Sequence, residues 1–155
     1  MIKILSQQEK HEVEMQLKEQ FGIESISGII LKMGEERFFI FSGSFSESEI
    51  RKLEKVVFIE RLGIYFAKIV LGEDAIKLSI EGVQMLGNQI KKNIIELDEK
   101  QAESWMKGED LDIQTQKRGF VILKHKNDFL GCGKASEHKI GNFIPKSRRL
   151  RNKSS

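Results

Sequence analysis

Short runs of β-branched and aromatic residues recur along this chain of 155 residues, and glycines stand beside many of them. Runs of this length and composition are typical of strands. A glycine turn between the run at residues 26–32 and the run at residues 37–43 predicts a hairpin. Helical patterns lie between the later runs, so we expect a mixed α+β fold. The runs cover residues 26–32, 37–43, 56–71, 75–80, 93–97, 119–125, 129–135 and 139–144.

The N-terminal half carries two helix signals. A capping box over residues 6–9 precedes apolar residues at helical spacing, and Gly22 follows as a stop. A second capping box over residues 46–49 opens a helix that we expect to turn Ile50 and Leu53 inward.

The pattern changes after Gly72. Asp98 can cap a helix over residues 99–107, which Gly108 ends, and a loop then leads to two strand runs around the turn at 126–128. The change predicts two compact domains of similar size. We expect domains at residues 1–72 and 73–151, followed by a tail at 152–155.

Charge is distributed unevenly. Residues 1–116 hold 15 Lys and Arg against 21 Asp and Glu, a net charge of −6, whereas residues 117–155 hold 11 against 2, a net charge of +9. A basic end of this kind favours a partner with phosphates. An acidic protein, a membrane surface and a solvated tail without specific function are the alternatives that charge alone leaves open.

The cysteine content limits the chemistry. Cys132 is the single cysteine, and it stands between Gly131 and Gly133. A nucleophilic role would need a base nearby, for which His125 and His138 are the local candidates. We expect instead a small side chain in the core. The three histidines have no metal-ligand spacing and no glycine pattern forms a nucleotide-phosphate loop, so no metal or cofactor is expected.

The sequence also bears on compartment. No apolar run approaches the roughly 20 residues of a membrane helix, and the N-terminus lacks the pattern of a signal peptide. A single cysteine fits a reducing compartment, so we expect a cytoplasmic protein that does not bind membranes.

The C-terminal half resembles the PUA domain, an RNA-binding module named for pseudouridine synthases and archaeosine transglycosylases. The family pattern is a helix that ends in Lys-Gly-Glu/Ala-Asp-Leu/Val, a strand after a glycine, and a hairpin that closes on small-Gly-x-Gly. The corresponding segments here are residues 105–111, 119–124 and 130–134. The closing Pro-Lys-x-Arg-Arg is similar to the ends of PUA domains attached to rRNA cytosine-5 methyltransferases.

The resemblance implies an N-terminal α/β pre-PUA domain followed by a PUA-type β pseudobarrel with short helices. Small archaeal stand-alone proteins and ribosome-biogenesis factors share this plan. The 155 residues leave no room for a methyltransferase, synthase or transglycosylase domain, so we expect a binding module that is not an enzyme. It would hold structured rRNA or tRNA as an accessory in RNA modification or ribosome assembly, and its N-terminal domain would dock a protein partner. An adaptor for an acidic protein and an enzyme that uses Cys132 are the rival classes.

The expected RNA contacts are cations and glycine backbone. Lys and Arg neutralise phosphate, and Arg matches phosphate oxygens bidentately. Glycine admits a close sugar-phosphate backbone, and we expect Gly108, Gly131 and Gly133 to expose theirs. Pro145 fixes its φ and so directs the cations that follow. The predicted RNA-binding set is Lys117, Arg118, Lys124, Lys126, Lys134, Lys146, Arg148, Arg149, Arg151 and Gly108.

The aromatic residues of the same half have two possible roles. RNA-binding proteins stack unpaired bases on exposed rings. We nevertheless expect Trp105, Phe129 and Phe143 to lie in the core of the C-terminal domain.

Overall fold

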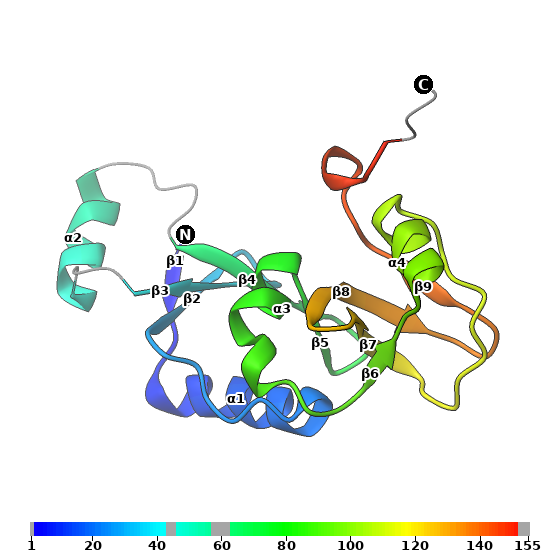
Figure 1. Cartoon of the computed structure of the whole chain (residues 1–155). Helices are drawn as coiled ribbons and strands as arrows, with labels where there is room; N and C mark the ends of the chain where they lie inside the picture. Colours follow the sequence, from blue (N-terminus) through cyan, green and yellow to red (C-terminus); the bar gives the residue numbers. More distant parts are fainter. Residues whose placement is uncertain (1, 43–45, 57–62, 152–155) are drawn as a thin grey trace.

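The computed structural model describes residues 2–42, 46–56 and 63–151 (Figure 1). Its strands form two sheets, with the orders β1-β2-β3-β4-β5 and β6-β7-β8-β9, which we call the first and second sheet. All pairs are antiparallel except β6 with β7. The strands are β1 (Ile2–Ile4), β2 (Ile29–Met33), β3 (Arg37–Phe41), β4 (Ile64–Val70), β5 (Ala75–Leu78), β6 (Ile94–Glu96), β7 (Gly119–His125), β8 (Asp128–Ala135) and β9 (Ile140–Asn142).

Helices connect and cover these strands, so the expected mixed α+β class is confirmed. In the described part of the chain, no helix is long and apolar enough to cross a membrane. The helices are α1 (Gln7–Phe21), α2 (Glu47–Val56), α3 (Ile80–Leu86) and α4 (Glu99–Met106), with two 3-10 turns, η1 (Gly87–Gln89) and η2 (Lys146–Arg148).

Helix α1 forms as its capping box predicts. The Ser6 hydroxyl accepts from the Glu9 N–H at 3.1 Å, and the Glu9 carboxylate accepts from the Ser6 N–H at 3.4 Å. Gly22 ends the helix in the left-handed region, with φ 78°. The same reciprocal bonds join Ser46 and Glu49 ahead of α2.

The strand predictions hold with shifted ends. The hairpin pairs β2 with β3, and the run at residues 56–71 contributes β4, while residues 57–62 lie outside the described part. In α2, Ile50 is fully buried, and the predicted inward side chain of Leu53 lies outside the described set. Strand β1 was not predicted: three residues at the N-terminus pair with β2.

One hydrophobic core joins the two sheets. Helix α1 and α3 pack with one face of the first sheet, and Phe120, Ile122 and Cys132 of the second sheet belong to the same cluster. A second cluster surrounds Trp105, between α4 and the second sheet. Strand pairing also continues across the predicted boundary at residue 72, because β5 pairs with β4. The first sheet thus extends beyond residue 72 to Leu78. The division into domains at residues 1–72 and 73–151 stays a prediction.

The Gly-Cys-Gly sequence serves packing. A Cβ at Gly133 would lie 2.7 Å from Cη2 of Trp105, which is fully buried, so glycine makes room for the indole. Gly131 has φ 138°, a conformation that favours glycine. Both glycines are buried in β8. The expectation that they expose backbone to RNA is therefore wrong, because the side chains of Trp105 and Ile80 lie against this part of the strand.

Candidate nucleic-acid interface

The predicted cations lie along the second sheet and on the segment that follows it. Strands β7 and β8 pair from Gly119 with Ala135 to His125 with Asp128. The seven residues of β7 therefore separate its two ends by about 20 Å. Lys117 and Arg118 stand at one end of β7 and Lys124 at the other, so these cations form separate groups.

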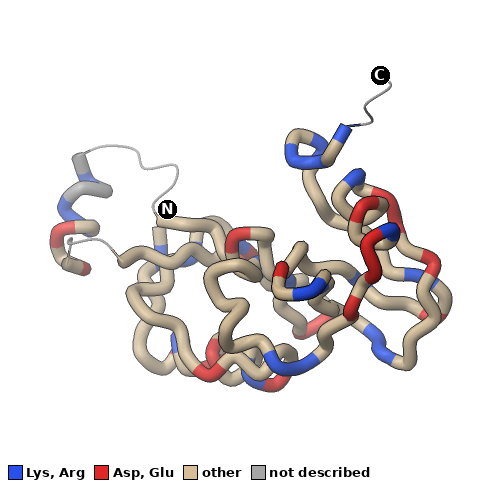
Figure 2. Tube along the Cα trace, viewed as in Figure 1, with Lys and Arg blue, Asp and Glu red and all other residues tan. Residues whose placement is uncertain are grey.

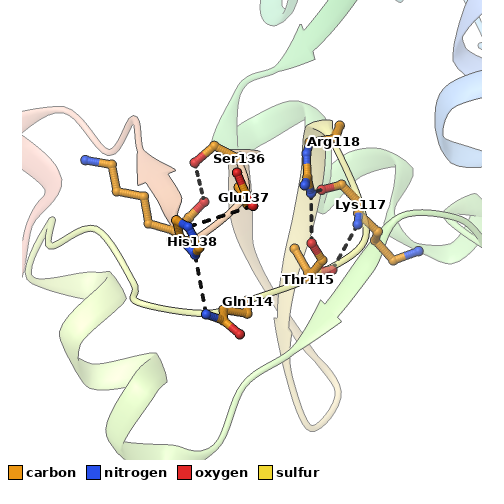
Figure 3. A network of polar contacts seen from close by, with 8 residues as sticks. Gln114, Thr115, Lys117, Arg118, Ser136, Glu137 and His138 are labelled. Carbon is orange, nitrogen blue, oxygen red and sulfur yellow. Dashed lines mark hydrogen bonds and ion pairs between the residues drawn. The ribbon is translucent and has the colours of Figure 1, made fainter.

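The first group stands at the turn before β7 (Figure 3). The Arg118 guanidinium donates to the carbonyl oxygens of Thr115 and Lys117, both at 2.9 Å, and the Lys117 N–H donates to the Thr115 hydroxyl at 3.2 Å. Gln114 contacts His138 at 3.3 Å at the same end of the sheet. Figure 3 shows the Lys117 side chain extending away from this network, and the network holds the start of the strand in place.

The second group surrounds the turn between β7 and β8. Lys126 is exposed in this turn, with φ 55°. The Lys124 ammonium lies 5.1 Å from the ring centroid of half-buried Phe129. His125 donates from Nδ1 to the carbonyl oxygen of Leu97 at 2.9 Å, which fixes the end of β7. Lys126 is therefore the cation of this group that faces solvent most directly.

Lys134 stands apart from both groups. Its ammonium forms an ion pair with Glu73 at 2.6 Å and lies 5.8 Å from the centroid of the Phe120 ring. It therefore faces the loop between β4 and β5 of the first sheet.

The third group is the C-terminal basic segment, residues 146–151. Pro145 has φ −59° and precedes η2. The Leu150 N–H donates to the Met106 carbonyl oxygen at 2.8 Å, and Arg149 Nε donates to the Ile144 carbonyl oxygen at 2.9 Å. Figure 2 shows Lys and Arg gathered on this segment. The backbone of the segment is thus held against the end of α4. A solvated tail would instead have a backbone free of such contacts, so this alternative is disfavoured.

Individual cations of the segment have different surroundings. Arg148 forms an ion pair with Glu81, and both side chains are 44% exposed. Arg149 is half-buried and occupies the space where a side chain at Gly108 would stand. A phosphate that approaches Gly108, whose φ is 90°, therefore meets the Arg149 side chain first. Lys146 and Arg151 are exposed.

The aromatic residues divide between core and surface. Trp105 is fully buried, as expected. Phe129 packs against Gly87 beside the main core. Phe143 is 41% exposed, so its predicted place in the core is wrong. It follows β9 directly and lies over Phe120, outside the sheet, and alternation of apolar residues does not predict this position.

Cys132 behaves as a core residue. It is 6% exposed, and burial raises the pKa of its thiol to about 12. The group therefore stays protonated at neutral pH, and the interpretation as a small buried side chain is confirmed. Among the described residues, no group of three His, Cys, Asp or Glu is arranged to hold a metal ion.

Comparison with known proteins assigns the second sheet to a class. Residues 92–150, from just before β6 to the C-terminal basic segment, match the family described as the methyltransferase RsmF PUA domain. This part of the chain is therefore a PUA-type domain related to those of rRNA methyltransferases. The relation to the archaeal type with a pre-PUA domain stays a prediction.

A curated relative extends the similarity toward the N-terminus. The chain is 28% identical over 131 residues to the ribosomal RNA small subunit methyltransferase F of Psychromonas ingrahamii. The alignment covers 82% of this chain and 26% of the relative. The chain thus spans about a quarter of the length of the relative that it matches.

Proposed function

We propose that this protein binds structured RNA through its PUA-type domain, with the C-terminal basic segment at the centre of the contact. The observation that carries the proposal is the anchoring of this segment, in which Leu150 bonds Met106 at the end of α4 and Arg149 bonds the Ile144 carbonyl oxygen. Cations on a folded backbone lose less conformational freedom on binding than cations on a free tail. Neutralised phosphate then supplies a large share of the affinity.

The RNA class comes from the relative. Its name describes a methyltransferase of small-subunit ribosomal RNA, so we propose rRNA as the ligand and a role beside rRNA modification or ribosome assembly. Methyl transfer is not carried over, because the alignment covers only 26% of that relative. We propose a binding module without catalytic activity in the cytoplasm, and a protein partner for the first sheet and its helices.

The mode of binding follows from the distribution of cations. Double-stranded RNA hides its base edges in a deep groove, so shape and backbone contacts dominate its recognition. The two ends of β7 are about 20 Å apart. An RNA that reaches both Arg118 and Lys126 must therefore present phosphates over a similar span, which favours a folded RNA over a short single strand.

A salt titration tests the proposal. We expect the affinity for a structured fragment of small-subunit rRNA to fall between about 50 and 200 mM salt with a slope near −3 in log K against log salt. Each phosphate neutralised on a duplex contributes a slope of roughly −0.9, and Lys146, Arg148 and Arg151 are the exposed cations of the basic segment. A polyglutamate peptide serves as the competitor. A slope near zero, or equal competition by the peptide, would contradict RNA binding by this surface.

A further inference from the structure

A cleft of about 340 Å³ lies where the two sheets meet. The first sheet contributes Lys68 and Lys77, the second contributes Phe120 and Lys134, and Phe143 comes from the chain after β9. The volume is within the range of about 300–1,000 Å³ that small-ligand sites occupy. Neither sheet builds this cleft alone.

Phe143 is an exposed aromatic ring with a defined position. Its centroid lies 6.2 Å from that of Phe120, with an angle of 54° between the rings, and Phe120 is buried. The Lys77 ammonium lies 4.3 Å from the Phe143 centroid. Although these neighbours hold it, the ring is still 41% exposed. An aromatic ring held in this way is a surface on which a base can stack without a large loss of side-chain entropy.

The cations around the ring are not equally paired. Lys68 contacts Glu36 at 3.1 Å, and Lys134 contacts Glu73 at 2.6 Å. Within the described residues, no ion pair holds Lys77. Burial lowers the pKa of Lys77, and repulsion from nearby Lys68 lowers it further. An anion beside Lys77 would offset both effects, so the cleft favours a negatively charged ligand.

We propose that this cleft binds an unpaired nucleotide of an RNA, with its base stacked on Phe143 and its phosphate beside Lys77. The proposal rests on the proposed RNA binding and adds a single-strand subsite to it. Sequence-tolerant RNA sites combine a positively charged groove with aromatic rings in this way. An acidic peptide would use the cations but gain little from the exposed ring.

Phe143→Ala tests the stacking contact. The probes are a short single-stranded oligoadenylate and an abasic oligonucleotide of the same length and charge. We expect Phe143→Ala to weaken oligoadenylate binding roughly 5- to 150-fold, as the loss of one stacked base does, and to leave abasic binding unchanged. Met15→Ala is the matched control, because Met15 is 57% exposed on α1. A melting curve for each variant verifies the fold.

Phe143→Trp gives a second readout on a folded protein. It preserves a stacking surface, so oligoadenylate binding should be retained. The native chain has one tryptophan, Trp105, which is fully buried. A new exposed indole should therefore be quenched by oligoadenylate and not by the abasic probe.

Lys77→Gln tests the phosphate contact, with exposed Lys55 of α2 changed to Gln as the control. We expect Lys77→Gln to reduce the salt slope for oligoadenylate by about 0.7, the share of one phosphate on a single strand. If the Phe143→Ala variant binds oligoadenylate as tightly as the parent, the proposed subsite is wrong. If the parent still binds the structured rRNA fragment in that case, only the subsite fails. If the parent binds neither RNA, the proposed function fails with it.

Discussion

Changing Lys146, Arg148 and Arg149 together to glutamine is expected to weaken binding to a structured rRNA fragment by about a hundredfold or more. Hydrogen bonds to charged groups contribute roughly 1.5–3 kcal/mol each, and two at the low end correspond to about a hundredfold. Lys146 and Arg148 are exposed on η2, and Arg149 covers Gly108. Titration of each variant at one fixed salt concentration measures the change.

Two further variants separate charge from structure. Arg149 also bonds the Ile144 carbonyl oxygen, so its loss should lower stability as well as affinity. A double change of Lys146 and Arg148 to Gln spares this bond, and should keep the melting temperature while losing most of the affinity, because exposed ion pairs contribute only about 0–1 kcal/mol. The matched control changes Lys52 and Lys55 of α2, both exposed, to Gln. Equal losses in the two double variants would mean that the basic segment is not the centre of the contact.

Trp105→Ala is expected to destabilise the fold by about 3–5 kcal/mol, as large-to-small changes in well-packed cores do. The indole is fully buried between α4 and the second sheet, and it fills the space that Gly133 leaves. The same region supports the C-terminal basic segment through Met106. Urea unfolding followed by circular dichroism measures the loss, since the variant has no tryptophan left to report it.

Trp105→Phe is the control for the indole N–H. Of the buried side-chain polar atoms described, Trp105 Nε1 is the one without a hydrogen-bond partner. Replacement by phenylalanine therefore removes no hydrogen bond and should cost much less than replacement by alanine. If the two variants are equally unstable, the packing of the ring is not what Trp105 contributes.

Local patterns in the sequence predict the elements well. Capping boxes bond the residue three positions ahead, so Ser6 with Glu9 and Ser46 with Glu49 act within one turn and need no knowledge of the tertiary fold. The β7–β8 hairpin is equally local, because its strands flank one short turn. Family resemblance then supplies the order of these elements in the C-terminal half.

Contacts between distant segments are what local patterns leave open. Phe120 and Ile122 share a core with α1, which lies about a hundred residues earlier in the chain. Strand β6 pairs in parallel with β7 across α4, and nothing in its three residues predicts the partner. The cleft depends on the packing of the two sheets, since Lys77 comes from the first sheet and Phe143 from the chain after the second.

The predicted RNA-binding set shows the same limit. Charge alone places the predicted cations of residues 117–151 in one group. The fold instead divides them between the two ends of β7 and the segment after β9, with Lys134 apart on β8. Lys134 forms an ion pair with Glu73, and the Arg149 guanidinium donates to the Ile144 carbonyl oxygen. The exposed members, among them Lys126, Lys146 and Arg151, are the ones left to meet phosphate directly.

Mapping of amide chemical shifts by NMR, with the structured rRNA fragment added stepwise, tests RNA binding by this surface most directly. We predict the largest shifts at residues 146–151 and at the Gly108 turn, with smaller ones at the ends of β7. Helix α2 should stay unchanged, because it packs on the opposite face of the first sheet from the core that the two sheets share. Shifts confined to α1 and α2, or none at RNA concentrations that saturate a PUA domain of known affinity, would contradict the account.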